Sequence, residues 1–496
     1  MSAKDNNYNR RQFLRQSACA SLGLTGLVST LAHLRLMQAA VACQNPLPDF
    51  RAMVCLFLFG GIDSNNILIP ATGHPARADY DSGRGVLAIP DSSLLDIFPD
   101  NSTDPYGLHP NLQPMADLFN SGELAFVNNT GSLSYPIPDR CAYLNGTVPV
   151  PPQLFSHSDQ QIQWQSSIPD KPFQSGWGGR IAELLNASYN PMSEVSMSIS
   201  LAGSNSFQIG TGGSVVQYAV TPTGAVSLVG YGNNYENALN PDGSYQTNNA
   251  GMRLKAFEEI MNYTHTHLLE EGYDTVVRRA RDQEGVIGDA IQAADNSGVD
   301  FDAIFFNAQT PMGDQLKMIA KLIAGRDCLA NQRQIYFCSM GGYDTHQDQN
   351  NDLNNLCDEL GSALKAFSDA MIALGVNDDV LTCTNSDFTR TLTPNGIDPN
   401  SSGSDHGWGG HQIVMGGPVY GKNLYGSFPS LKVGDDDDVD NNRGRWIPST
   451  AVDQYAAVCA KWIGVDSSGM DAIFPNLHRF DDPFGSGPNL QFVDLT

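Results

Sequence analysis

The chain is poor in basic residues. Lys and Arg number 28 against 53 Asp and Glu, which gives a formal net charge of −25 at neutral pH. A surface of this sign repels nucleic-acid phosphates and anionic lipid head groups. We therefore exclude sequence-independent nucleic-acid binding and expect divalent cations to be more natural partners.

Several motifs that would assign a function are also missing. The sequence contains no Walker A loop, no Gly-x-Ser-x-Gly elbow, no dinucleotide-binding fingerprint and no Cys-x-x-Cys pair. Phosphate-loop nucleotide hydrolysis, serine-esterase chemistry, NAD-linked redox and a zinc ribbon all lose support. Cys19 falls in the signal, and Cys55, Cys338 and Cys383 fall in predicted strands. Cys141, Cys328, Cys357 and Cys459 are left able to pair in an oxidising compartment.

The N-terminus is predicted to be a targeting segment. Residues 9–15, Asn-Arg-Arg-Gln-Phe-Leu-Arg, precede a moderately apolar run over 18–32 and small residues before Cys43. This order is typical of a twin-arginine export signal spanning residues 1–42. A basic amphipathic helix and lipidation at Cys43 are the alternatives. We expect a periplasmic or secreted protein with no transmembrane helix in the mature chain.

The mature chain, residues 43–496, is predicted to form a single α/β domain. Apolar runs at 52–59, 334–339 and 380–384 have the character of strands buried on both faces, and residues 352–374 carry apolar side chains at helical spacing. We expect parallel strands, with 412–415 as a further one. Residues 191–250, rich in Gly, Ser, Asn and Thr, are predicted to be a β-rich insertion.

Acids and histidines follow the predicted strands. In parallel sheets ligands collect beyond the carboxyl ends of the strands, so these side chains are expected to share a site. Carboxylates with imidazoles suit zinc, manganese or a related divalent ion, with calcium as another possibility, and this many ligands would suffice for two ions. The candidate metal ligands are Asp63, Asp344, His346, Asp387, Asp405, His406 and His411. Taken alone, Asp63 and Asn66 would more simply cap a turn.

Catalytic candidates come from the start of a predicted helix. Ser158 and Gln161 have the spacing of a capping box, which places Ser156, His157 and Ser158 at a helix N-terminus that could bind an anion or activate a hydroxyl. Alternatively Ser158 only caps the helix. Asn66 and Arg390 are candidates to bind the substrate.

Eight segments together resemble a known bacterial family. They are residues 60–66, 108–110, 156–157, 176–180, 343–346, 386–391, 405–411 and 462–464. With the twin-arginine start, they resemble the exported domain of unknown function 1501, which is similar to the alkaline phosphatase and sulfatase superfamily. The resemblance implies a doubly wound α/β/α sandwich with metal ligands at strand ends.

The resemblance also implies roles for single residues. Asp63 would match the acid after the first strand, Asp344 and His346 one metal site, Asp387 the other, and His411 the late histidine. The chain departs from the superfamily pattern where Phe388, not histidine, follows Asp387, so the second metal is either missing or held by Asp405 and His406. No Cys-x-Pro-x-Arg occurs, which excludes a formylglycine sulfatase on that motif.

Two functions remain open from the sequence. The first is an exported metal-dependent hydrolase of phosphate or sulfate esters, acting on a small molecule or a polymer. The second is a non-catalytic binding or surface-assembly protein that keeps the fold and one metal, with an exported protein as partner.

Overall fold

The computed structural model describes residues 49–225, 228, 230–231, 235–240, 243–261, 283–440, 442–485 and 490–495. The predicted signal segment lies outside the described residues. Within the described residues, no helix is both long enough and apolar enough to cross a membrane.

A large mixed sheet forms the centre of the molecule. Its strands follow the order β14-β5-β13-β10-β1-β9-β6-β7-β8, with β15 paired to β5. The strands are β1 (Arg51–Leu58), β5 (Leu124–Gly131), β6 (Ser198–Ser200), β7 (Tyr218–Thr221), β8 (Gly224–Ala225), β9 (Arg333–Met340), β10 (Val380–Ser386), β13 (Gly410–Met415), β14 (Leu424–Tyr425) and β15 (Thr450–Ala451). Two smaller sheets join β2 (Leu68–Pro70), β4 (Tyr106–Leu108) and β3 (Leu95–Ile97), and β11 (Arg390–Pro394) with β12 (Ser404–His406).

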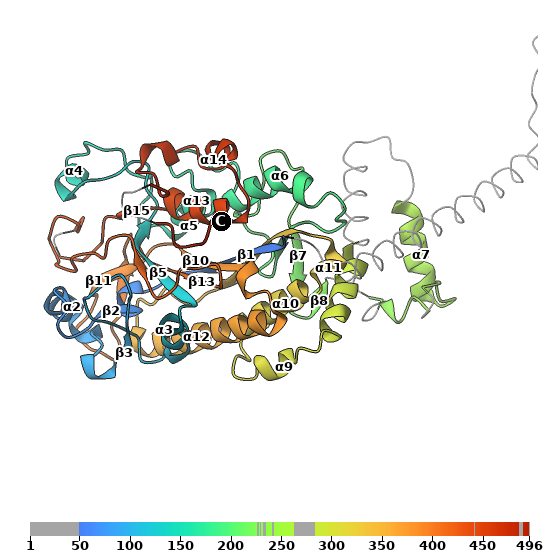
Figure 1. Ribbon diagram of the computed structural model, residues 1–496, viewed down its shortest axis with the longest axis horizontal. Helices are drawn as coiled ribbons and strands as arrows, with labels where there is room; N and C mark the ends of the chain where they lie inside the picture. Colours follow the sequence, from blue (N-terminus) through green and yellow to red (C-terminus); the bar gives the residue numbers. More distant parts are fainter. Residues whose placement is uncertain are drawn as a thin grey trace, which may run out of the picture.

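Helices cover both faces of the sheet, as Figure 1 shows. On one face lie α3 (Gln113–Ser121), α10 (Pro311–Ala324) and α12 (Gln349–Leu374), and on the other lie α5 (His157–Ser166), α6 (Trp177–Tyr189), α13 (Val452–Ile463) and α14 (Ser467–Ile473). The remaining named helices are α2 (Arg77–Arg84), α4 (Arg140–Leu144), α7 (Asn249–Met261), α9 (Phe301–Ile304) and α11 (Arg326–Leu329). The predicted α/β/α sandwich is confirmed.

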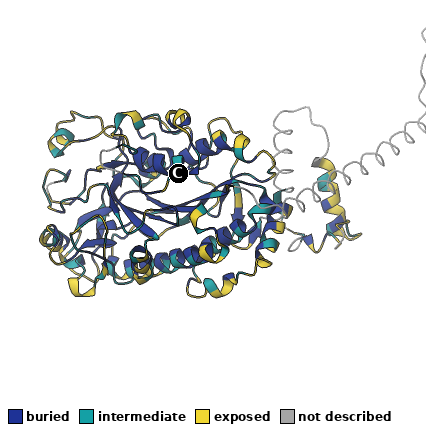
Figure 2. Cartoon of the chain, in the orientation of Figure 1, coloured by how far each residue is buried: buried dark blue, intermediate teal, exposed yellow. Residues whose placement is uncertain are grey.

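Strand β1 shows why the apolar runs form the middle layer. Its even-numbered residues, including Val54 and Leu56, belong to the core under α10 and α12, while Cys55 and Phe57 belong to the core under α6 and α13. Successive strand side chains point to opposite faces, so a continuous apolar run suits a strand covered on both sides. Figure 2 shows this sheet as the buried centre of the molecule.

The direction of one strand differs from the prediction. β1 is parallel to β9 and β10, as expected, but β13 runs antiparallel to both β10 and β5. The long segment between β10 and β13 brings the chain back to the carboxyl edge of the sheet, where β10 ends, before β13 begins. The start of β13, not its end, therefore lies beside the end of β10.

The predicted β-rich insertion extends the main sheet. Within residues 191–250, β6 pairs with β9 and β7 pairs with β6, so this segment adds strands at one edge of the sheet.

The four cysteines that were predicted to be able to pair differ in state. Cys328 is disulfide-bonded, whereas Cys141, Cys357 and Cys459 are free thiols.

Candidate metal centre

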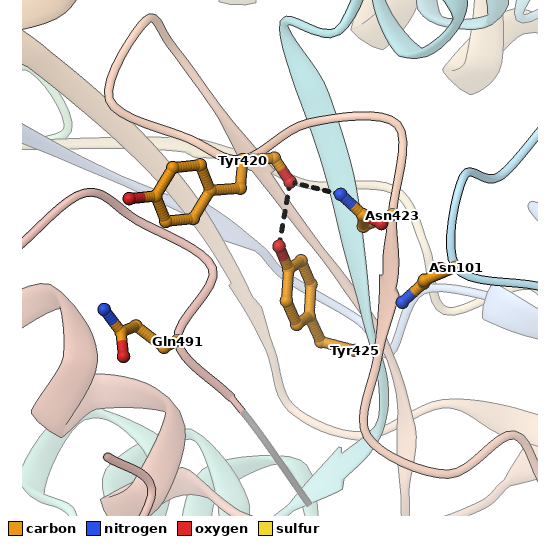
Figure 3. A pocket seen from close by; sticks show the side chains of 5 residues that line it. All are labelled: Asn101, Tyr420, Asn423, Tyr425 and Gln491. Carbon is orange, nitrogen blue, oxygen red and sulfur yellow. Dashed lines mark hydrogen bonds between the residues drawn. The ribbon is translucent and has the colours of Figure 1, made fainter. Parts of the chain in front are cut away.

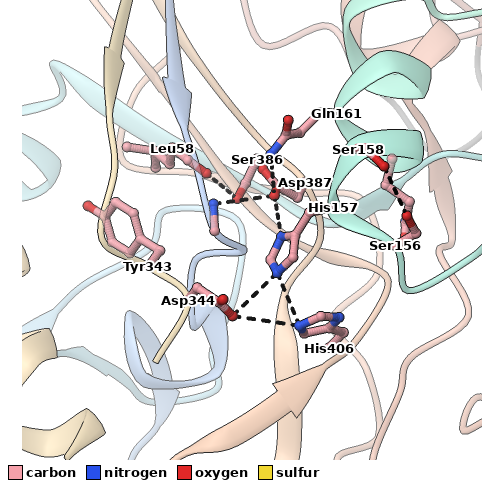
Figure 4. A network of polar contacts seen from close by, with 12 residues as sticks. Leu58, Ser156, His157, Ser158, Gln161, Tyr343, Asp344, Ser386, Asp387 and His406 are labelled. Carbon is pink, nitrogen blue, oxygen red and sulfur yellow. Dashed lines mark hydrogen bonds and ion pairs between the residues drawn. The ribbon is translucent and has the colours of Figure 1, made fainter. Parts of the chain in front are cut away.

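Polar side chains from four elements meet at the carboxyl edge of the central strands. The segment after β9 supplies Asp344, the segment after β10 supplies Asp387, the first turn of α5 supplies His157, and β12 ends in His406. Figure 4 shows His157 between Asp387 and Asp344, with His406 beside it. Because β1, β9 and β10 are parallel neighbours, their ends bring together residues hundreds of positions apart.

Three ligand atoms converge at this point. His157 Nε2 lies 3.1 Å from His406 Nε2 and 3.3 Å from Asp344 Oδ1, and His406 Nε2 lies 3.6 Å from the same oxygen. Ligands about 2.0–2.1 Å from a tetrahedral zinc lie roughly 3.4 Å apart. The three atoms therefore have the spacing of a metal site, and His157, Asp344 and His406 could hold a metal ion.

The proton on His406 is fixed by a backbone carbonyl. Its Nδ1 donates to Phe155 O at 2.7 Å, and a carbonyl oxygen can only accept. Burial lowers the pKa of His406, which favours the neutral ring. Its Nε2 consequently presents a lone pair toward His157 and Asp344. Phe155 itself has a φ of 70°, a left-handed conformation that is unusual for a bulky residue and is seen at functional sites.

The ring of His157 is oriented by a buried carboxylate. Its Nδ1 lies 2.6 Å from Asp387 Oδ2, which also accepts from Gln161 Nε2 at 2.9 Å and from Gly60 N at 3.3 Å. An oxygen that receives two other N–H groups acts as an acceptor, so His157 Nδ1 carries the hydrogen. A carboxylate that accepts from the other ring nitrogen in this way commonly orients a histidine that binds a metal.

A third histidine borders the group. His346 Nε2 lies 3.0 Å from both Asp344 Oδ1 and His406 Nε2, so it contacts two of the three ligand atoms. Its Nδ1 is 3.3 Å from Asp405 Oδ1, and Asp405 forms an ion pair with Arg443. Asp405 thus contacts His346 and Arg443, and it supports the cluster through His346.

Asp344 is held in its charged form by Arg390. Although burial alone would raise the pKa of Asp344, the guanidinium of Arg390, 2.9 Å from Oδ1, holds that pKa below its ordinary value. The Arg390 side chain is fully buried and also donates to the backbone carbonyls of Gly60 and Ser404. Arg390, predicted from the sequence as a candidate to bind the substrate, contacts the Asp344 carboxylate and anchors it to the backbone of Gly60 and Ser404.

The contacts within the cluster favour a positive charge between its ligand atoms. Neutral imidazoles with protonated Nδ1 atoms would turn nitrogen lone pairs toward one another at 3.0–3.1 Å, next to a carboxylate oxygen. Only a proton or a metal ion placed between such atoms removes the repulsion. The carboxylates of Asp344, Asp387 and Asp405 outnumber the guanidinium groups of Arg390 and Arg443 that contact them, so the net local charge also favours a cation.

Phe388, where the chain departs from the superfamily pattern, has a role in this arrangement. Its ring centroid lies 4.8 Å from those of both His157 and His406. A Cβ on Gly61, whose φ is 80°, would come within 2.4 Å of the Phe388 ring, so only glycine permits this close approach. Phe388 packs on the two imidazoles and limits their rotation.

Asp63 belongs to a different, buried cluster. It forms an ion pair with Arg84 and accepts a hydrogen bond from Gln349 Nε2 at 2.5 Å. Asn66 Oδ1 accepts from Arg84 Nε at 3.0 Å and from Tyr80 Oη at 2.8 Å, and Asn66 is fully buried. The structure therefore pairs Asp63 with the buried guanidinium of Arg84 and places the Asn66 side chain in the protein interior.

His411 and the two serines also lie apart from the ligand atoms. His411 stacks on Phe428 with ring centroids 4.9 Å apart, and burial lowers its pKa to about 3. Helix α5 begins at His157 with Ser156 as its N-cap, so the predicted capping box at Ser158 is wrong. The Ser156 and Ser158 hydroxyls contact each other at 3.3 Å, and Ser156 donates to Asp159 at 2.6 Å.

Several supporting residues were not predicted from the sequence. They are Gln161, which binds Asp387, the Phe155 carbonyl, Arg443, and the pair Arg84 and Gln349 around Asp63. In the sequence, Gln161 was assigned only to the predicted capping box with Ser158. A buried arginine such as Arg84 has no local sequence signal, because its partner lies 21 positions away.

The fold and these contacts define an α/β/α-sandwich protein with a candidate metal centre at the carboxyl edge of its central strands. The profile of a family described as "Protein of unknown function (DUF1501)" matches residues 51–443. The match spans most of the chain, and the chain belongs to this family.

Other comparisons add little about function. No curated protein matches the sequence. Among solved structures there is similarity to "Crystal structure of Ps i-CgsB in complex with k-i-k-neocarrahexaose", at 8% identity and a TM-score of 0.31, covering 88% of this chain and 78% of that chain. A similarity of this size carries no functional argument.

Proposed function

We propose that this protein is an exported hydrolase of phosphate or sulfate esters that works with one divalent metal ion held by His157, His406 and Asp344. The convergence of two imidazole Nε2 atoms and one carboxylate oxygen at 3.1–3.6 Å carries the proposal. Three protein ligands that leave a coordination position open are typical of catalytic metal sites.

The ligand set favours zinc or manganese over calcium. Imidazole nitrogen suits zinc and related transition metals, whereas calcium takes six to eight oxygen ligands. A single ion is favoured because Asp63, one of the seven candidate ligands, is already neutralised by Arg84, and because Phe388 packs where the superfamily pattern has a histidine.

The residues around the ion each have a defined part in this proposal. A divalent ion, when bound, would polarise an ester oxygen and lower the pKa of a water molecule. Asp387 and the Phe155 carbonyl keep the two imidazoles turned toward the ion, and Arg390 keeps Asp344 charged. With the ion in place the site would become net positive, which suits an anionic ester.

One observation favours a second candidate function. Among the described contacts, neither the Ser156 nor the Ser158 hydroxyl forms a hydrogen bond to the ligand atoms, so neither is poised as a nucleophile. A protein that holds a metal for binding or surface assembly, without turnover, fits this arrangement. In the hydrolase proposal the nucleophile is water.

Export by the twin-arginine pathway and the kinship with alkaline phosphatases and sulfatases belong to the same proposal. The sequence of residues 9–15 and the order of the resembling segments support them. Processing near residue 42 would be seen by N-terminal sequencing of protein recovered from the periplasm or the medium.

Elemental analysis of the purified mature protein tests the centre. We expect about one equivalent of zinc or manganese, lost in His157→Ala and His406→Ala and kept in His478→Ala, a matched exposed histidine outside the cluster. Equal metal content in all four proteins would contradict the assignment.

A hydrolysis screen separates the two functions. p-Nitrophenyl phosphate, p-nitrophenyl sulfate and sugar sulfates would be offered with and without chelator. Turnover that disappears in Asp344→Ala supports the hydrolase. Bound metal without turnover on any ester supports the binding protein instead.

A further inference from the structure

A hollow lies at the amino edge of the main sheet, opposite the edge that carries the metal centre. It has a volume of about 550 Å³ and is lined by Asn101, Tyr420, Asn423, Tyr425 and Gln491 (Figure 3). The backbone N–H of Lys422, in the same loop, donates to the carbonyl of Leu124, the first residue of β5. Because β5 and β10 are both antiparallel to β13, the start of β5 lies at the edge away from the metal centre.

The walls of the hollow are held by hydrogen bonds. Tyr425 Oη donates to Tyr420 O at 2.9 Å, and Asn423 Nδ2 donates to the same carbonyl at 3.2 Å, as the dashed lines in Figure 3 show. Asn101 exchanges two hydrogen bonds with the backbone of Leu424, of 2.8 and 3.0 Å. The shape of the hollow is therefore fixed in the absence of a ligand.

Two backbone features fix the loop further. Lys422 has a φ of 58°, in the left-handed region that non-glycine residues rarely adopt. A Cβ on Gly421 would come within 2.0 Å of Gly122 O, so glycine is required for the loop to reach the end of α3. Strained backbone that is held by its surroundings is more frequent at binding sites than elsewhere.

Among the described residues, the lining consists of two tyrosines and three amides, none of them charged. Tyr420 is 47% exposed, so its ring offers an aromatic face to a ligand, while Tyr425 is largely buried and forms the wall. Lys422, in the same loop, forms an ion pair with Asp100 at 3.0 Å. An uncharged hollow in a strongly acidic protein selects neither for an anion nor for a nucleic acid.

We propose that this hollow binds a neutral oligosaccharide. A sugar ring has an apolar C–H face that packs on an aromatic ring and hydroxyls around its rim that pair with amides. The volume lies within the range of small-molecule pockets, roughly 300–1,000 Å³. The site is independent of the metal centre and does not rest on the hydrolase proposal.

Calorimetric titration of the full mature protein tests this site with stated probes. The neutral probes are the hexasaccharides of cellulose, xylan, laminarin and starch, and oligogalacturonate is the anionic comparison. We expect at least one neutral hexasaccharide to bind at roughly millimolar affinity or better, equally well with and without chelator. Tyr420→Ala should weaken binding about tenfold or more, and Tyr420→Phe should keep most of it, because the ring remains.

Tyr135→Ala is the matched control, since Tyr135 is another partly exposed tyrosine, at 38%, outside the hollow. It should bind like the unaltered protein. The proposal is overturned if no neutral hexasaccharide binds at millimolar concentration, if Tyr420→Ala and Tyr135→Ala bind alike, or if only oligogalacturonate binds. Loss of binding on chelation would assign the sugar to the metal centre, and so would also overturn it.

Discussion

His157 Nδ1 lies 2.6 Å from Asp387 Oδ2, and this contact turns the other ring nitrogen of His157 toward Asp344 and His406. Asp387 is fully buried and follows β10 directly, so the sheet itself fixes the histidine ring. The metal-binding geometry therefore depends on a residue that is not a ligand.

Asp387→Asn should weaken metal binding by about 10- to 100-fold, the range found when the hydrogen-bond partner of a metal-binding histidine is replaced. An amide cannot accept from His157, Gln161 and Gly60 as strongly as a carboxylate does. Competition with a chromophoric zinc chelator measures the affinity. An affinity equal to that of the unaltered protein would show that Asp387 does not orient His157.

Phe388→Ala should also weaken metal binding, by roughly tenfold, without removing a ligand. The two imidazoles would lose the ring that packs 4.8 Å from each of them and would sample other rotamers. The same chelator competition applies, with Phe388→Leu as the control that keeps apolar volume. If Ala and Leu variants bind metal as tightly as the unaltered protein, the ring does not restrain the histidines.

Arg84→Met should destabilise the fold by about 3–5 kcal/mol, because it leaves Asp63 buried without its counter-charge. Urea unfolding of the chelated protein measures the change in free energy of unfolding. Adding Asp63→Asn to Arg84→Met should recover part of the loss, since the unpaired charge is gone. A double variant no more stable than the single one would mean that the ion pair is not the source of the effect.

The contribution of Asp453, on α13, to the free energy of unfolding should fall as pH rises from about 4 to about 7. Burial raises the pKa of Asp453 to about 7, and among the described residues neither carboxylate oxygen has a well-formed hydrogen bond. The folded state thus holds this proton more tightly than the unfolded state, and the contribution is complete below the ordinary pKa and lost above the raised one.

Asp453→Asn removes this titration. Relative to the variant, the unaltered protein should lose up to about 4 kcal/mol of unfolding free energy between acid and neutral pH, the equivalent of a shift of about three pKa units. Urea unfolding at several pH values compares the two proteins, and the difference cancels the other titrating groups. Parallel pH profiles would contradict the assignment.

Much of the fold could be predicted because local patterns encode it. The apolar run of β1 predicted burial on both faces, and the helical spacing over residues 352–374 predicted most of α12. Thr310 followed by Pro311 predicted the start of α10, where Thr310 Oγ1 accepts from Gly313 N at 3.1 Å. Each of these depends on side chains within a few residues of one another.

The direction of β13 and the choice among the histidines could not be predicted in the same way. His406 and His411 occur in one short motif, yet one faces the candidate centre and the other stacks on Phe428. Which of them faces the centre depends on how β12 and β13 are placed against distant strands. The spacing of the histidines in the sequence does not contain that information.

The sequence alone determined that the chain forms an acidic α/β sandwich with acids and histidines gathered beyond its strands, because composition and periodicity act locally. The tertiary structure decided that the ligand atoms of Asp344, His157 and His406 converge at one place, whereas Asp63 is neutralised by Arg84. Ligand spacing and charge compensation are set by contacts between residues far apart in the chain, and they exist only once the sheet has formed.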